Sequence, residues 1–347
     1  MLRTGWSAGL ILERLSMLRP LAVAAVAAFA ASPAFAGIIP LSDVENGTEV
    51  TADQCKAEPE TLWVKADGHE FCVRYYLSTA GGNGDEPVVF LNGDPGCRVD
   101  IRKKTCMFGP KAKPWSTEAR AGMAAQMSRA FEVPAVYLAR IGQDGSSGYS
   151  AWVHTELELD LANASLDALK ARLHARGFNL LGHSGGAGLA GALLGLRTDI
   201  NCDVVASGGL YITDTDPYKL CTGGQNCNRK LLSANAADHV GQMVQHGGHL
   251  YLVTDPRDTQ TRLDMQQPFV DAFRKVGGTV EQVFVDVPGD PHHHYTTQYG
   301  QTVMRDCLAN AADLQVEADV AGQNAGDLKT ALTKAVAAQA EADTDDQ

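Results

Sequence analysis

A glycine-rich segment at residues 182–186, GHSGG, places a serine where it can act as a nucleophile. The segment matches G-x-S-x-G, the pattern of a nucleophile elbow, in which a sharp turn between a strand and a helix exposes the serine hydroxyl. An apolar run at 179–182 predicts the strand, and small residues at 187–196 predict the helix. Ser184 would then lie at the helix N-terminus, where developing negative charge is stabilised. This context favours a catalytic serine over an inert serine in a glycine-rich turn.

Acidic residues and histidines that could act together with a serine nucleophile follow Ser184 in the chain. Asp255 and Asp258 come after an apolar run at 249–254, and three histidines (292–294) come after another at 280–287. Histidine can take and return a proton near neutral pH, because its ordinary pKa is about 6.5. An aspartate beside it would orient the ring and stabilise its protonated form. The residue types predict a Ser-His-Asp set, and the spacing leaves open which aspartate and which histidine belong to it.

A second glycine-containing loop carries a resemblance to a known family. Residues 92–96 read NGDPG after an apolar run at 88–91, and they resemble the H-G-x-P-G loop of the α/β-hydrolase family, with Asn92 where His is usual. The resemblance covers nearly the whole domain and implies an α/β-hydrolase fold, with a mainly parallel central sheet and helices on both faces. It also implies that the backbone amides of Asp94 and Gly185 form an oxyanion hole. An acidic side chain at position 94 departs from the family pattern.

The same resemblance selects among the candidates for acid and base. Asp258 is favoured over Asp255, because the family usually places its acid further past the strand. His293 is favoured as the base, since His-His-x-Thr before a helix is similar to the family pattern, and His292 is the second choice. The implied chemistry uses no cofactor and no metal. Three consecutive histidines in an extended loop point in different directions and rarely bind one metal together.

The elements that must position these residues alternate along the chain. Apolar runs predict strands at 61–66, 71–77, 88–91, 133–139, 179–182, 203–209, 249–254 and 280–287. Amphipathic or small-residue patterns predict helices at 116–130, 156–176, 187–196, 230–246, 264–276 and 297–311. Such alternation predicts right-handed βαβ units and a mainly parallel sheet, with the first two strands as an antiparallel hairpin at its edge. The hydrolase domain is expected at 37–312. Residues 313–347, with nine Ala and eight acidic residues, are expected to form a frayed helix or a disordered acidic tail.

The N-terminal residues predict export. Residues 1–16 read as an upstream extension, and residues 20–36 are an apolar run that follows Arg19 and ends in an A-x-A site at 34–36. This is the pattern of a secretory signal peptide, with cleavage before Gly37. Its apolar part, about 14 residues, is shorter than the roughly 20 that a membrane-spanning helix needs. We therefore expect a periplasmic or secreted protein that has no membrane span after cleavage.

The cysteines agree with an oxidising compartment. All eight lie after the predicted cleavage site, where disulfides are the expected state. Zinc is the alternative, but the chain has no C-x2-C pair. The short separations favour the pairs Cys55/Cys72, Cys97/Cys106 and Cys221/Cys227.

Composition limits the classes of partner. The chain has 29 basic and 41 acidic residues, a formal net charge of -12, which argues against a nucleic-acid partner because phosphate binding needs a basic surface. We therefore predict an exported serine hydrolase that cleaves a small-molecule ester or amide through an acyl-enzyme on Ser184. The alternatives are a non-catalytic binding protein that keeps the fold, and an acyltransferase.

Overall fold

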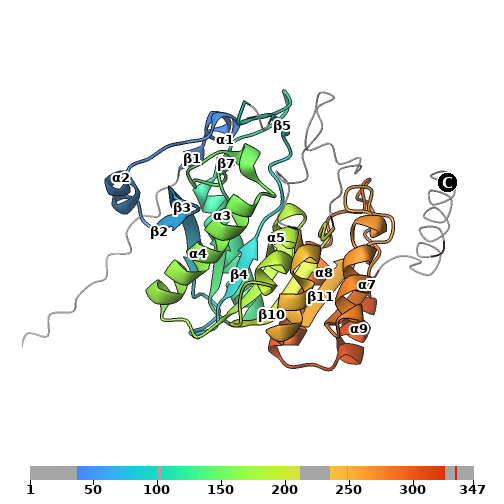
Figure 1. Ribbon diagram of the computed structural model, residues 1–347. Coiled ribbons are helices and arrows are strands. Elements are labelled where there is room, and N and C mark those ends of the chain that lie inside the picture. Colours follow the sequence, from blue (N-terminus) through green and yellow to red (C-terminus); the bar gives the residue numbers. More distant parts are fainter. Residues whose placement is uncertain (1–36, 101–102, 212–234, 248, 325–332, 334–347) are drawn as a thin grey trace, which may run out of the picture. The chain divides into compact units, whose positions relative to one another are not determined.

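The computed structural model describes residues 37–100, 103–211, 235–247, 249–324 and 333 (Figure 1). Several predictions fall outside these residues. They are the signal peptide and its upstream extension at 1–36, the pair Cys221/Cys227, and most of the predicted acidic tail.

Within the described residues, eight strands form one sheet in the order β12-β11-β10-β9-β4-β8-β3-β2. Six of them run parallel: β4 (Val88–Leu91), β8 (Ala135–Leu138), β9 (Phe178–His183), β10 (Ile200–Ala206), β11 (His249–Thr254) and β12 (Thr279–Phe284). The hairpin of β2 (Thr61–Ala66) and β3 (His69–Ser78) adds the antiparallel edge, where β3 pairs with β8. The mainly parallel sheet with an antiparallel edge hairpin is thus confirmed.

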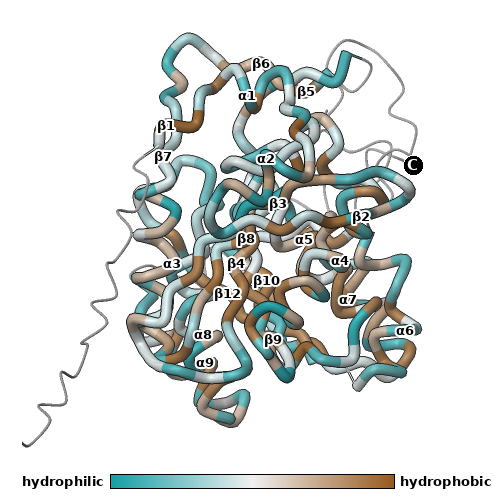
Figure 2. The backbone as a smooth tube through the Cα atoms, turned by 90° about the vertical axis from the view of Figure 1, so that its left-hand side faces the viewer, coloured by the Kyte–Doolittle hydropathy of each residue, from teal (hydrophilic) through white to brown (hydrophobic). Residues whose placement is uncertain are grey.

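Helices cover both faces of the sheet. One face packs against α4 (Glu156–Leu173), α5 (Gly185–Leu194), α6 (Val240–Gln245) and α7 (Gln267–Lys275). The other face packs against α3 (Thr117–Phe131), α8 (Thr297–Leu308) and α9 (Asp313–Ala321). The central strands are buried on both sides and appear largely brown in Figure 2, as expected for a parallel sheet between two helix layers.

Polar caps begin two of these helices where the sequence favours a start. The hydroxyl oxygen of Ser116 accepts a hydrogen bond from the N–H of Ala119, and that of Thr155 accepts one from Glu158. Each bond satisfies an N–H group that has no partner inside its helix. The helix predicted at 116–130 is thus present as α3.

Smaller elements precede or follow the loop at 92–96. They are β1 (Ile38–Ile39), α1 (Leu41–Asn46), α2 (Ala52–Ala57), β5 (Arg98–Asp100), β6 (Thr105–Met107) and β7 (Trp115–Ser116). Strands β5 and β6 pair as an antiparallel hairpin, and a disulfide joins Cys97 to Cys106 beside it. This bridge fixes the chain directly after the loop.

Two other disulfides bear on the predictions. The predicted pair Cys55–Cys72 is present. Cys202–Cys307, which joins β10 to α8 across 105 residues of sequence, was not among the predicted pairs. Sequence spacing favours short loops and contains no information on a pair that the fold brings together from so far apart.

The segment after residue 312 begins with a helix. Residues 313–321 form α9, whose Val316 and Val320 are buried against the sheet, so packing continues beyond residue 312. The two valines lie one helical turn apart, which is too short a pattern to stand out in an Ala-rich, acidic segment. At 230–246, the described residues hold a 3-10 turn (Ala236–His239) followed by α6, in place of one long helix. None of the described helices is long and apolar enough to cross a bilayer.

Candidate active site

Ser184 occupies a strained turn between β9 and α5. Its backbone has φ 54° and ψ −123°, and its N–H donates to the carbonyl of Ala206 on the neighbouring β10 at 2.9 Å. A side chain at Gly186 would collide with the backbone of the loop that follows β4, so the tight turn needs glycine there. The strand and helix predicted around Ser184 are both present, and together they form the nucleophile-elbow geometry.

His294 connects Ser184 to Asp258. Its Nε2 lies 2.8 Å from Ser184 Oγ, and its Nδ1 lies 2.8 Å from Asp258 Oδ2. Both His294 and Asp258 are almost completely buried. Because a carboxylate can only accept, it fixes the proton on Nδ1 and leaves Nε2 free to accept from the serine hydroxyl. This geometry is suited to removing the proton of Ser184.

The prediction of His293, with His292 as second choice, is corrected by this geometry. His293 Nδ1 lies 3.3 Å from Asp255 Oδ2, and His292 is exposed with its Nδ1 3.1 Å from Thr259 Oγ1. The cause is a turn in which several backbone N–H groups donate to one carboxylate. Asp290 accepts hydrogen bonds from the N–H groups of His292, His294 and Tyr295, while His293 adopts a left-handed φ of 53°. The turn directs the third histidine toward Ser184.

The choice of Asp258 over Asp255 agrees with the contacts of each carboxylate. Asp258 Oδ1 accepts from the N–H groups of Gln260 and Thr261 at 2.7 and 2.9 Å, and its Oδ2 accepts from the Thr261 hydroxyl as well as from His294. These donors stabilise a charged carboxylate that faces the imidazole.

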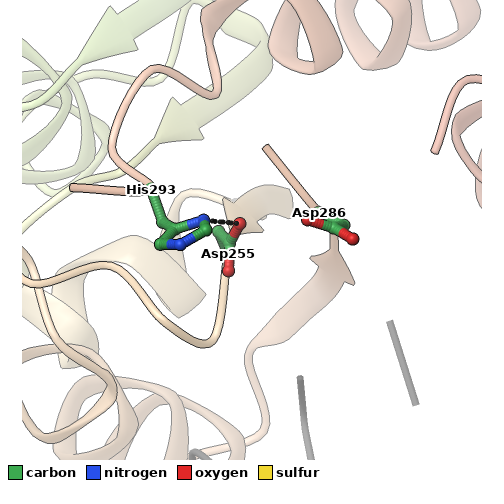
Figure 3. A group of neighbouring side chains, drawn as sticks. All are labelled: Asp255, Asp286 and His293. Carbon is green, nitrogen blue, oxygen red and sulfur yellow. Dashed lines mark ion pairs between the residues drawn. The ribbon is translucent and has the colours of Figure 1, made fainter. Parts of the chain in front are cut away.

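Asp255 instead joins the acid loop to the histidine loop. Its Oδ2 accepts from the N–H of Val287 at 2.7 Å, and Arg257 pairs with both Asp255, at 3.0 Å, and Asp286. Figure 3 shows Asp255, Asp286 and His293 as neighbours, with the His293–Asp255 ion pair drawn as a dashed line. The cluster therefore holds together the loops that carry Asp258 and His294.

The same three side chains are candidate ligands for a metal ion. Each offers one ligand atom, and these atoms lie within 4.8 Å of one another. The guanidinium of Arg257, however, already contacts both carboxylates and neutralises part of their charge. The cluster is thus satisfied as an ionic link between loops and does not call for a cation.

The loop at 92–96 approaches the nucleophile closely. A Cβ at Gly93 would lie 3.0 Å from the Cβ of Ser184, and a Cβ at Gly185 would collide with the carboxylate of Asp94. The two residues predicted to supply the oxyanion hole, Asp94 and Gly185, thus lie against each other beside Ser184.

Comparisons with known proteins agree with this architecture. No protein-family model matches the sequence, and no match to a curated protein was found. Among solved structures, the chain is similar to the esterase Pf2001 of Pyrococcus furiosus in two crystal forms. The first has a TM-score of 0.52 at 17% identity and covers 77% of this chain and 98% of that one. The second has a TM-score of 0.51 at 15% identity and covers 76% and 97%. The chain has the α/β-hydrolase fold.

A third similar structure is the acylaminoacyl peptidase of Pyrococcus horikoshii. It has a TM-score of 0.47 at 15% identity, and the match covers 72% of this chain and 41% of that one.

In this α/β-hydrolase fold, the acidic side chain at position 94 is held by an arginine and a histidine. Arg140 Nη1 lies 2.9 Å from Asp94 Oδ1, and His154 Nε2 lies 2.8 Å from Asp94 Oδ2. Burial acts to raise the pKa of Asp94, but His154 and Arg140 outweigh it and hold this pKa below its ordinary value. Burial likewise opposes the charge on His154, and Asp94 overcomes it, so the pKa of His154 is raised.

Glu158 completes this network from α4. It pairs with Arg140 through Nε at 2.8 Å and Nη2 at 3.1 Å, and it accepts from the N–H of His154 at 2.5 Å. With His154 protonated, two anions face two cations, so the negative charge of Asp94 beside the predicted oxyanion hole is balanced. The sequence gives no signal for this network, because its four side chains lie up to 64 residues apart and join only in the fold.

His183, which precedes Ser184, is a neutral neighbour of His294. Burial and the adjacent His294 lower the pKa of His183 to about 4. Its ring lies 5.2 Å from that of His294 and stacks on Tyr295 at 5.9 Å with an interplanar angle of 16°. The residue adds no positive charge next to His294 near neutral pH.

A cavity of about 510 Å³ opens onto Ser184 and His294. Its walls combine the 92–97 loop with apolar and polar side chains that include Val99, Met123, Val153, Gln260, Tyr295 and Thr297. This volume is within the range of small-molecule sites.

Proposed function

We propose that this protein is a serine hydrolase that cleaves a small-molecule ester or amide through an acyl-enzyme on Ser184. The observation that carries the proposal is the position of His294, within 2.8 Å of both Ser184 Oγ and Asp258 Oδ2. Because one ring contacts both groups, the serine can lose its proton as it attacks a carbonyl carbon. The cavity supports a substrate of small-molecule size.

The reaction follows from the chain's own residues and water. His294 Nε2 takes the Ser184 proton while Oγ attacks the carbonyl, and the amides of Asp94 and Gly185 receive the oxyanion. His294 then gives its proton to the leaving alcohol or amine as the carbonyl–leaving-group bond breaks. Water, deprotonated by the same ring, attacks the acyl-enzyme, releases the acid and restores Ser184. Asp258 stabilises the protonated imidazole in both halves.

We also propose that the protein acts outside the cytoplasm. Three disulfides among the described cysteines support this location, because such bonds persist in oxidising compartments. The signal-peptide pattern at 20–36 gives independent support.

A fluorophosphonate probe tests the central chemistry, since it reacts covalently with activated serines. We expect wild type to be labelled and Ser184→Ala to be unlabelled. Ser207→Ala is a matched control, because Ser207 is also a buried serine after a strand, yet its hydroxyl contacts Thr296. Absence of labelling in folded wild type would favour a non-catalytic binding protein. Labelling with acyl transfer to an added alcohol in preference to water would favour an acyltransferase.

A further inference from the structure

Tyr295 is the exposed aromatic side chain next to the catalytic base. It follows His294 in the chain, lines the cavity at Ser184 and is 64% exposed. Among the described residues, the other large hydrophobic side chains with high exposure are aliphatic or Met: Ile38, Met107, Leu196 and Val276. An exposed ring at a cavity is suited to contact with a ligand, because binding removes its apolar surface from water.

The ring is held in place before any ligand binds. Its backbone N–H donates to Asp290 Oδ2 at 2.9 Å, and the ring stacks on His183. It also meets His294 edge to face, at 6.1 Å and 62°. Because the turn and the stacking restrict the side chain, a ligand that packs on it has less conformational entropy to remove.

The position of Tyr295 identifies the part of the substrate that it faces. His294 must give its proton to the leaving group, so the leaving group lies beside the imidazole ring of His294 during the reaction. The carbonyl oxygen lies toward the amides of Asp94 and Gly185, which belong to other elements. Tyr295, adjacent to His294, is therefore on the leaving-group side of the cavity.

We propose that Tyr295 is a binding platform for the leaving group and that this site prefers esters of planar, aromatic alcohols. The proposal rests on the proposed hydrolase function and adds the substrate class. Planar rings stack on a fixed tyrosine in offset or edge-to-face arrangements, which saturated rings of similar size cannot reproduce.

A matched pair of substrates tests the platform in the full chain. Benzyl acetate and cyclohexylmethyl acetate share the acyl group and have leaving alcohols of similar size, and they differ in planarity. We expect kcat/KM of wild type to be about five- to tenfold higher for the benzyl ester, in line with the strength of aromatic pairs. Tyr295→Ala should abolish this preference, and Tyr295→Phe should keep it. Leu196→Ala, which alters an exposed side chain two residues after α5, should leave the preference unchanged.

Two further measurements separate the platform from the catalytic machinery. Methyl acetate has no ring, so its kcat/KM should fall less in Tyr295→Ala than that of benzyl acetate does. Benzyl alcohol should slow fluorophosphonate labelling of wild type more than cyclohexylmethanol does, and Tyr295→Ala should remove the difference. Two results would overturn the platform while the hydrolase function stands. One is an equal loss of kcat/KM for all three esters in Tyr295→Ala, and the other is that both alcohols slow the labelling of wild type equally. Absence of both labelling and hydrolysis would overturn both.

Discussion

At the scale of single residues, the site depends on an acidic side chain that is packed against a glycine. Asp94 lies against Gly185 and is held by Arg140 and His154, so a carboxylate is accommodated beside the position proposed for the oxyanion. Because the carboxylate fills the space next to the helix start, residue 185 has room for a hydrogen atom only. Position 185, directly after Ser184, is thus restricted to glycine by Asp94.

Gly185→Ala is accordingly expected to damage the site. The added methyl group must displace Asp94 or move the 185 amide, and loss of an oxyanion donor typically lowers kcat by about 10²–10³-fold. We expect a loss of at least about tenfold in the rate of fluorophosphonate labelling. Gly241→Ala in α6, where a Cβ meets nothing within 4 Å, is the matched control and should label at the wild-type rate. Equal rates for the two variants would contradict the packing described for Asp94.

At the scale of elements, the site is assembled where strands end. β9 leads into Ser184, the loop after β11 carries Asp258, and the loop after β12 carries His294. Parallel strands bring these ends to one edge of the sheet, and the contacts of Asp255 and Arg257 link the last two loops. The three strands thus lead to the three residues of the candidate site: Ser184 follows β9 directly, and Asp258 and His294 lie further along the loops after β11 and β12.

Strand β10, next to β9, carries a buried aspartate whose contribution to the stability of the folded state depends on pH. Asp203 is completely buried, and neither of its carboxylate oxygens has a hydrogen-bond partner in the described part of the chain. Burial raises the pKa of Asp203 to about 8. The folded state therefore favours the protonated form of Asp203. The free energy of unfolding is highest with respect to this group below about pH 4, and it falls as the pH rises toward 8.

Asp203→Asn should therefore stabilise the protein at high pH. The amide is close in size and stays neutral, so the gain in unfolding free energy should grow by several kcal/mol between pH 4.5 and pH 8. Denaturant unfolding of wild type and variant at both pH values measures it. A difference between the two proteins that does not change with pH would show that Asp203 is ionised in the folded state.

At the scale of the whole molecule, the features that follow local patterns could be predicted and those set by distant contacts could not. The edge hairpin, Ser184 in its elbow and the Asp258 loop each follow from a run of neighbouring residues. The choice among the three histidines is an exception, because it depends on a local turn whose hydrogen bonds to Asp290 direct His294 inward and leave no mark in the histidine spacing. The Asp94 network and the Cys202–Cys307 bridge join residues that only the fold brings together.

The Cys202–Cys307 bridge should contribute to global stability. It closes a loop of about 105 residues, so it restricts the unfolded chain, and loss of such a bond typically costs about 2–5 kcal/mol. We expect the double variant Cys202→Ala/Cys307→Ala to unfold at lower guanidinium concentration than wild type. A reducing agent should lower the midpoint of wild type as well. An unchanged midpoint in the double variant would contradict a stabilising role for this link between β10 and α8.

The choice of base can be tested by replacing two adjacent histidines. His294 contacts both Ser184 and Asp258, whereas His293 contacts Asp255 in the link between loops. Values of kcat/KM for p-nitrophenyl acetate should therefore be measured for wild type, His294→Ala and His293→Ala, with circular dichroism to confirm folding. We expect a loss of about 10³-fold or more in His294→Ala and of less than about tenfold in His293→Ala. The reverse order of losses in folded variants would contradict His294 as the base.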